Sequence, residues 1–162
     1  MVEGRVQVMQ RIKWSNEFEI GINVIDAQHR RIVSYINTLA DVEGKVDRQA
    51  IAVVIDALVD YTYSHFAFEE ALMEEADYEF LSVHQQTHDA FTRRISDLHQ
   101  RFKDGDDVSS ELGELLQTWL IDHIQNDDQS YAPKVREQYK LLDNKSNGSW
   151  ISKTVNRFFP AG

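Results

Sequence analysis

The sequence predicts an all-α protein with four helices in an up-and-down antiparallel bundle. Apolar residues recur at three- and four-residue spacing along four segments, whereas strand-like alternation is confined to the short Val6-Gln7-Val8 arm. The chain has two prolines, Pro133 and Pro160, so well over a hundred interior residues contain no helix breaker. The expected connections are roughly three to eight residues long, which makes successive helices antiparallel neighbours.

The first two helices are defined by their apolar stripes. The first begins near Asp26 and ends near residues 43–44. Its stripe consists of Ile32, Val33, Ile36, Leu39 and Ala40. The second begins after Asp47, whose carboxylate is suited to cap a helix N-terminus, and extends to about Ala76. Its stripe consists of Ile51, Val54, Ile55, Leu58, Tyr61, Phe68 and Leu72.

A polar turn at residues 103–107 separates the third predicted helix from the fourth. The stripe of the third helix consists of Leu81, Phe91, Ile95, Leu98 and Phe102. The fourth helix follows Ser109 or Ser110, and its stripe consists of Leu112, Leu115, Leu116, Trp119 and Leu120. We therefore expect a four-helix domain at residues 1–142, with an N-terminal arm at 1–25.

Residues 143–162 form a polar linker followed by a short amphipathic tail. The apolar residues of the tail fall on one helical face and are Trp150, Ile151, Val155, Phe158 and Phe159. We expect this face to dock back onto the bundle. The alternative is that residues 150–159 bind a protein partner, mediate self-association or continue into a longer signalling chain.

Composition excludes several classes of function. Among 162 residues there are 17 Lys and Arg against 27 Asp and Glu, and the net charge of −10 argues against binding to nucleic acid or anionic lipid. The absence of cysteine excludes disulfides, thiolate zinc sites, iron–sulfur clusters and cysteine nucleophiles. No signal-like N-terminus and no run of eighteen apolar residues is present, so we expect a cytoplasmic protein without a membrane span.

Five of the six histidines lie on the apolar stripes and are expected to face the interior. They are His29, His65, His84, His88 and His123. Glu69 follows His65 by four residues and shares its face. His99 is the exception and is expected at the solvated rim. Buried polar groups without partners cost on the order of 1–3 kcal/mol each, so a metal centre is the economical explanation for this cluster.

The number of nitrogen and oxygen ligands indicates more than one ion. Five imidazoles and two carboxylates are too many for a single first-row ion, so two ions are expected. Glu69 is one bridging carboxylate, and the other is Asp122, Asp127 or Asp128. At about 100° per residue, Asp127 lies about 40° from His123, whereas Asp128 lies about 140° away and requires a loosened turn. Helical geometry leaves this choice open.

In order and spacing, these residues resemble the hemerythrin family, and specifically its bacterial members. The resemblance covers residues 14–139. The matching segments are Trp14-Ser15, the Gly21–His29 stretch GINVIDAQH, the His65–Glu70 stretch HFAFEE, His84-x-x-x-His88, and His123-Ile124 followed by Asp128.

The resemblance implies a bundle that holds two iron ions with an oxo or hydroxo bridge. The residues matching His84, His88 and His123 hold one iron, and those matching His29 and His65 hold the other. Glu69 and Asp128 bridge both, which implies that the helix is distorted just past His123. One coordination position then stays open on the iron with two imidazoles. The family's apolar pocket positions are matched by Ile32, Trp119, Leu120 and Ile124.

The resemblance implies reversible O2 binding for carriage, storage or sensing, and we do not expect catalysis. No candidate histidine has a glutamate three residues before it, unlike the ferritin-like oxidases. The alternatives are a di-iron enzyme acting on peroxide, nitric oxide or another small oxidant, an O2- or redox-sensing module of a signalling system, and a zinc-filled or purely structural bundle.

Overall fold

The computed structural model describes residues 10–42, 47–143 and 149–159, and within these ranges all regular structure is helical. This confirms the all-α class. The elements are η1 (Asn16–Phe18), α1 (Asn23–Val42), α2 (Arg48–Glu75), α3 (Leu81–Lys103), α4 (Ser109–Asp122), η2 (His123–Asp128), α5 (Gln129–Asp143) and α6 (Ser149–Phe158).

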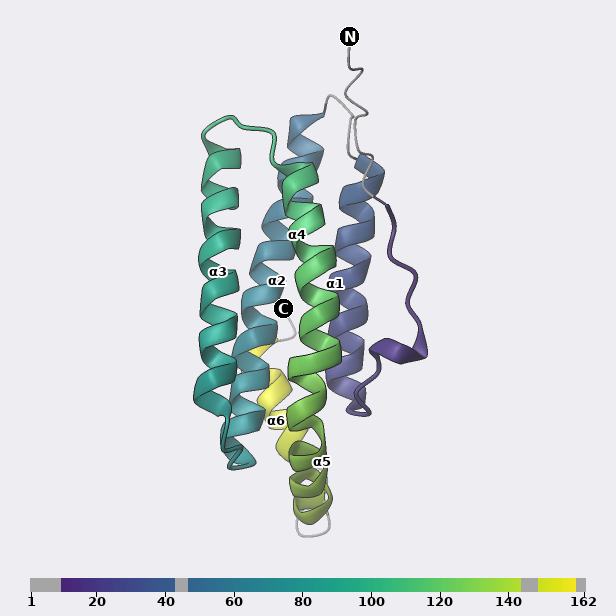
Figure 1. The fold of residues 1–162 in the computed structure, drawn as a ribbon, viewed down its shortest axis with the longest axis vertical. Helices are drawn as coiled ribbons and strands as arrows, with labels where there is room; N and C mark the ends of the chain where they lie inside the picture. Colours follow the sequence, from purple (N-terminus) through teal and green to yellow (C-terminus); the bar gives the residue numbers. More distant parts are fainter. Residues whose placement is uncertain (1–9, 43–46, 144–148, 160–162) are drawn as a thin grey trace.

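The long helices stand side by side as an up-and-down bundle (Figure 1). Helices α1, α2 and α3 each form one rod, and the contiguous α4, η2 and α5 form another. Helix α2 contacts α1, α3 and α5, while α1 also contacts α4. The buried faces meet in one apolar core, so each long helix can contribute side chains to the same interior point.

Local hydrogen bonds explain where the first two long helices begin. Asp47 caps α2 as predicted, because its carboxylate accepts a hydrogen bond from the backbone N–H of Ala50 at 3.1 Å. Helix α1 begins at Asn23, three residues before the predicted start at Asp26. The buried Asp26 carboxylate accepts hydrogen bonds from the backbone N–H groups of Ile20 and Gly21, at 2.8 and 3.2 Å. These bonds fix the loop that leads into α1.

The described apolar side chains of the tail dock onto the bundle, as expected. Helix α6 lies against α2 and α5, and Val155, Phe158 and Phe159 pack against the core. The Phe159 ring lies 5.2 Å from the ring of Tyr61 and 5.9 Å from that of Phe68. The side chains of Trp150 and Ile151 lie outside the described residues.

Among the described residues, one helix, α2, is long and apolar enough to cross a membrane by length and composition. This is weak support for a span, because the core helix of a bundle meets the same criterion. In the structure α2 buries Ile55, Leu58 and Leu72 in the core and also carries His65 and Glu69.

The docking of the tail predicts a measurable contribution to stability. Phe159→Ala removes two aromatic contacts from a half-buried ring, so we expect the free energy of unfolding in urea to fall by about 1–3 kcal/mol. Lys153→Ala, which changes an exposed position of α6, should change it by less than about 0.5 kcal/mol. Equal stabilities for the two variants would contradict a docked tail.

Candidate metal centre

Seven buried polar side chains converge in the middle of the bundle, and each is at most 5% exposed. Helix α1 contributes one, α2 two, α3 two and η2 two. Their possible ligand atoms form two overlapping sets in which all atoms lie within 4.8 Å of one another. One set is Glu69, His84, His88, His123 and Asp128, and the other is His29, His65 and Glu69. The structure therefore brings together all the residues that the sequence analysis selected as ligands.

The last two members of the cluster depend on a local change in helix type. The His123–Asp128 segment is a π-helix, in which residues five apart lie one turn apart. Asp128 is therefore fully buried, and its Oδ1 atom lies 3.0 Å from His123 Nε2. The side chain of Asp127 is 40% exposed, and Asp122 is exposed, so neither carboxylate lies within the cluster. The distortion implied by the family resemblance is present.

Both buried carboxylates face donor atoms of both sets. Asp128 Oδ2 lies 3.1 Å from His29 Nε2, while its Oδ1 lies 3.3 Å from His84 Nε2. Glu69 Oε2 lies 3.2 Å from His88 Nε2 and 3.7 Å from His65 Nε2. Both carboxylates are therefore placed where they could hold cations bound by either set.

Gln28 orients one imidazole from outside the cluster. Its Oε1 atom lies 2.7 Å from His65 Nδ1 and accepts that N–H, which leaves Nε2 free of a proton and facing the interior. Sequence reasoning missed this residue, although its position directly before His29 placed it near the same interior. The amide is buried and supplies a neutral acceptor.

Carboxylates face the outer nitrogens of two other imidazoles. Asp127 Oδ2 lies 2.8 Å from His123 Nδ1, and the hydrogen bond lowers the pKa of Asp127. Glu70 Oε1 lies 3.5 Å from His88 Nδ1. Asp127 was one of the three open choices for the second bridging carboxylate. Its hydrogen bond to Nδ1 instead orients the candidate ligand His123.

Tyr131 is a second residue that the sequence analysis did not select. It is fully buried, and its hydroxyl donates a hydrogen bond to Glu69 Oε1 at 2.5 Å. Burial and the nearby Glu69 carboxylate raise the pKa of Tyr131 well above its usual value, so the phenol keeps its proton. Its position three residues after Asp128 was the available signal for a shared inward face.

Burial and charge move the pKa values of the cluster in opposite directions. Burial lowers the pKa of His65 to about 3. Burial also lowers the pKa of His84, but hydrogen bonds and charge interactions with Asp128 and Glu69 outweigh it and raise the value to about 9. Burial raises the pKa of Glu69, yet the surrounding imidazoles hold it well below the usual range. The carboxylates are therefore ionised and require positive charge nearby.

The unmatched polar atoms of the cluster fit a bound cation. Among the described residues, nine buried side-chain nitrogen or oxygen atoms lack a hydrogen-bond partner, and eight of them belong to this cluster. His88 Nε2 and His123 Nε2 lie only 3.0 Å apart, as two nitrogens directed at one point do. Imidazole and carboxylate donors suit iron, zinc and related first-row ions.

The remaining predicted residues fall around this cluster. Ile32, Leu120 and Ile124 are buried in the core. Trp119 is partly buried and lies flat against the His123 imidazole, with ring centroids 4.2 Å apart. His99 lies outside the cluster, as expected, and its Nε2 atom is 2.6 Å from Asp56 Oδ1.

The helical bundle and its buried histidine–carboxylate cluster are typical of a metalloprotein that binds its ions between helices. Residues 20–135 match the family model of the hemerythrin HHE cation-binding domain. The chain belongs to the hemerythrin family.

Similar proteins cover different shares of the chain. The bacteriohemerythrin of Pseudomonas paraeruginosa is 48% identical over 152 residues, which are 93% of this chain and 99% of that protein. The bacteriohemerythrin of Methylococcus capsulatus is 31% identical over 72% of this chain and 90% of its own length. A crystal structure of wild-type hemerythrin superposes with a TM-score of 0.75 at 30% identity, covering 78% of this chain and 98% of the other.

The two adjacent aspartates should respond differently to substitution. Asp128→Ala removes a carboxylate that faces both donor sets, so we expect loss of at least one bound ion. Asp127→Ala removes only the support of His123 and should weaken metal binding by about 10–100-fold. Asp127→Asn keeps an oxygen acceptor without the charge and serves as the control, with a smaller loss of affinity than Asp127→Ala. Metal titration against a competing chelator measures all three, and equal losses in the two alanine variants would contradict the assignment.

Proposed function

We propose that this chain binds O2 reversibly at a non-haem di-iron centre. The observation that carries the proposal is the division of the cluster into two donor sets that share Glu69, with Asp128 also facing histidines of both sets. The proposed iron ligands are His29, His65, Glu69, His84, His88, His123 and Asp128. Two bound ferrous ions would supply the electrons that O2 takes up on binding and returns on release.

The protein residues have three roles in this proposal. Glu69 and Asp128 balance the charge of the ions, and Tyr131 keeps Glu69 Oε1 engaged by donating its hydroxyl proton. Gln28 and Asp127 hold the outer nitrogens of His65 and His123, so that the inner nitrogens face the ions. The contacts of Tyr131, Gln28 and Asp127 orient the metal-binding side chains before any ion arrives, which reduces the reorganisation needed on binding.

Apolar residues around the cluster favour release of O2 over further reaction. The proposed pocket consists of Ile32, Trp119, Leu120 and Ile124, and burial of its aliphatic members opposes entry of water. Without water, a bound diatomic ligand has little access to additional protons. This supports carriage, storage or sensing of O2 rather than catalysis on peroxide or nitric oxide. A cytoplasmic location remains a prediction from the sequence.

Iron analysis combined with optical spectroscopy tests the function directly. Protein purified without added metal should contain about two iron ions per chain, and its oxidised form should show oxo-to-iron charge-transfer bands in the near ultraviolet. The reduced form should bind O2 and release it on degassing. Irreversible oxidation with no oxygenated species would contradict O2 carriage, steady turnover of peroxide or nitric oxide would favour an enzyme, and zinc alone would indicate a structural site.

The pocket residue Leu120 should protect the oxygenated protein. Leu120→Ala opens space for water beside the proposed site, so we expect oxygenated protein to convert to the oxidised form several-fold faster. Leu112→Ala is the control, because Leu112 is equally well buried on the same helix but eight residues earlier. Conversion followed by its absorbance change should separate the two variants, and equal rates would mean that general loosening of the core, rather than the pocket, is responsible.

A further inference from the structure

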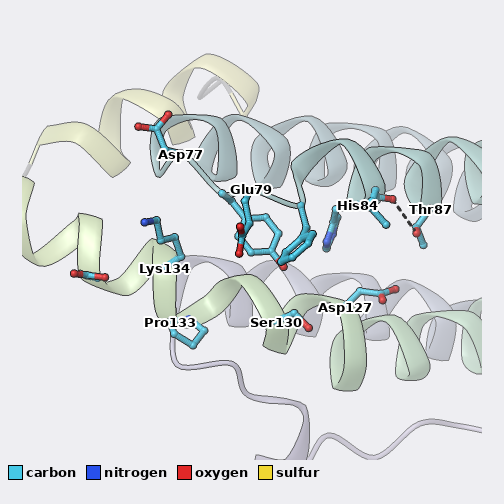
Figure 2. A pocket seen from close by; sticks show the side chains of 12 residues that line it. Asp77, Glu79, His84, Thr87, Asp127, Ser130, Pro133 and Lys134 are labelled. Atoms are coloured by element: carbon cyan, nitrogen blue, oxygen red, sulfur yellow. Dashed lines mark hydrogen bonds between the residues drawn. The ribbon is translucent and has the colours of Figure 1, made fainter.

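A groove of about 900 Å³ opens beside the candidate metal centre. The turn after α2 and the first residues of α3 form one wall, and η2 and α5 form the facing wall (Figure 2). Residues that carry the argument below are Asp77, Glu79, Phe80, Val83, His84 and Glu137.

His84 joins this groove to the candidate centre. Its imidazole lines the groove, yet its Nε2 atom lies 3.3 Å from Asp128 Oδ1 and 3.8 Å from Glu69 Oε2. In Figure 2 the His84 ring projects from α3 toward the facing helix. One proposed iron ligand therefore lines the groove, and its ring separates the groove from Asp128 and Glu69.

The groove has the surface of a protein-docking site. Phe80 is 54% exposed and Val83 is 60% exposed, which makes them two of the most exposed large apolar residues in the described chain. Four lining residues carry carboxylates and one, Lys134, carries a positive charge. An apolar centre with a charged rim is the usual organisation of a protein interface, and the negative rim selects a positively charged partner.

We propose that this groove docks a small, basic electron-transfer protein that reduces the di-iron centre through His84. The inference rests on the proposed function, since O2 binding requires ferrous ions and a centre that has become ferric must be reduced again. Two successive encounters would deliver one electron each and reduce two ferric ions. Each donor molecule loses one electron, and no covalent bond forms between the proteins.

The exposed apolar residues distinguish docking from the entry of a metal ion. A negative rim alone would also attract ferrous ions, but a hydrated ion gains nothing from contact with Phe80 and Val83. The groove between α3 and α4 provides a matched comparison, because Trp119 lines it and stacks on His123. It is lined by as many carboxylates but by two arginines, Arg93 and Arg94, where the first groove has Lys134 alone, so its lining is less negative.

Electron transfer to ferricytochrome c, a small basic haem protein, probes the proposed surface in the reverse direction. The reduced iron-loaded protein is mixed with ferricytochrome c without O2, and the haem absorbance reports the second-order rate constant at low and high salt. Two double variants alter the groove. Glu79→Gln with Glu137→Gln removes rim charge, and Phe80→Ser with Val83→Ser removes the apolar centre. Phe80 occupies the N-cap position of α3, where serine is favourable for folding.

Matched variants elsewhere serve as controls. Asp97→Asn with Glu114→Gln removes the same charge from the groove between α3 and α4. Val53→Ser removes an apolar residue that is 62% exposed on α2. We expect both groove variants to lower the rate constant at low salt by about three- to ten-fold, with the charge effect vanishing at high salt. The control variants should leave it unchanged.

Zero-length cross-linking between carboxylates and cytochrome c lysines gives a second readout that needs no iron. Cross-links mapped to Glu79, Glu137 or Asp77 support docking in the groove, whereas cross-links spread evenly over the acidic surface overturn it. Equal rate losses in groove and control variants also overturn it.

If the rates are unchanged but ferrous ions load more slowly into the rim variant, the groove admits metal instead. Failure to bind iron at all would contradict the proposed function, while the cross-links would still decide the docking.

Discussion

Two ionised carboxylates buried in an apolar core set the main constraint on this molecule. Glu69 and Asp128 are 0% exposed, and an uncompensated charge in such a place costs many kcal/mol. Every long helix contributes to the compensation, through imidazoles from α1, α2, α3 and η2 and through the Tyr131 hydroxyl from α5. Packing of the bundle and assembly of the charged cluster therefore depend on each other, and a bound cation would complete the balance of charge.

The π-helical segment shows how backbone geometry serves that constraint. A regular α-helix would direct Asp127 inward with His123 and would turn Asp128 away. The π-turn instead buries Asp128 and leaves Asp127 on the outside, where it binds the other nitrogen of the same imidazole. One irregular turn thus places two consecutive carboxylates on opposite sides of His123, and each acts on a different ring nitrogen.

Periodicity was sufficient to predict α1 to α4, the inward histidines and the rim position of His99, because these depend on spacing along one helix, whereas no stripe was assigned to residues 129–143, where α5 lies. The choice of Asp128 could not follow from spacing, since a π-turn is stabilised by contacts that other helices provide; it followed only from the family resemblance. Gln28 and Tyr131 were missed for a related reason. Spacing indicates at most that they face inward; their partners, His65 and Glu69, lie on another helix, so no pattern within one segment reveals the contacts.

The outer nitrogens of the imidazoles meet different acceptors in the two halves of the cluster. His123 faces the Asp127 carboxylate and His88 faces Glu70, whereas His65 faces only a neutral amide. His29 Nδ1 and His88 Nδ1 are both buried without a hydrogen-bond partner. A carboxylate increases the basicity of the imidazole that it binds, so the Asp127 hydrogen bond makes His123 a stronger donor than His65. In the proposed di-iron centre, the two positions would therefore differ in reduction potential, and the first electron to arrive would not be shared equally between them.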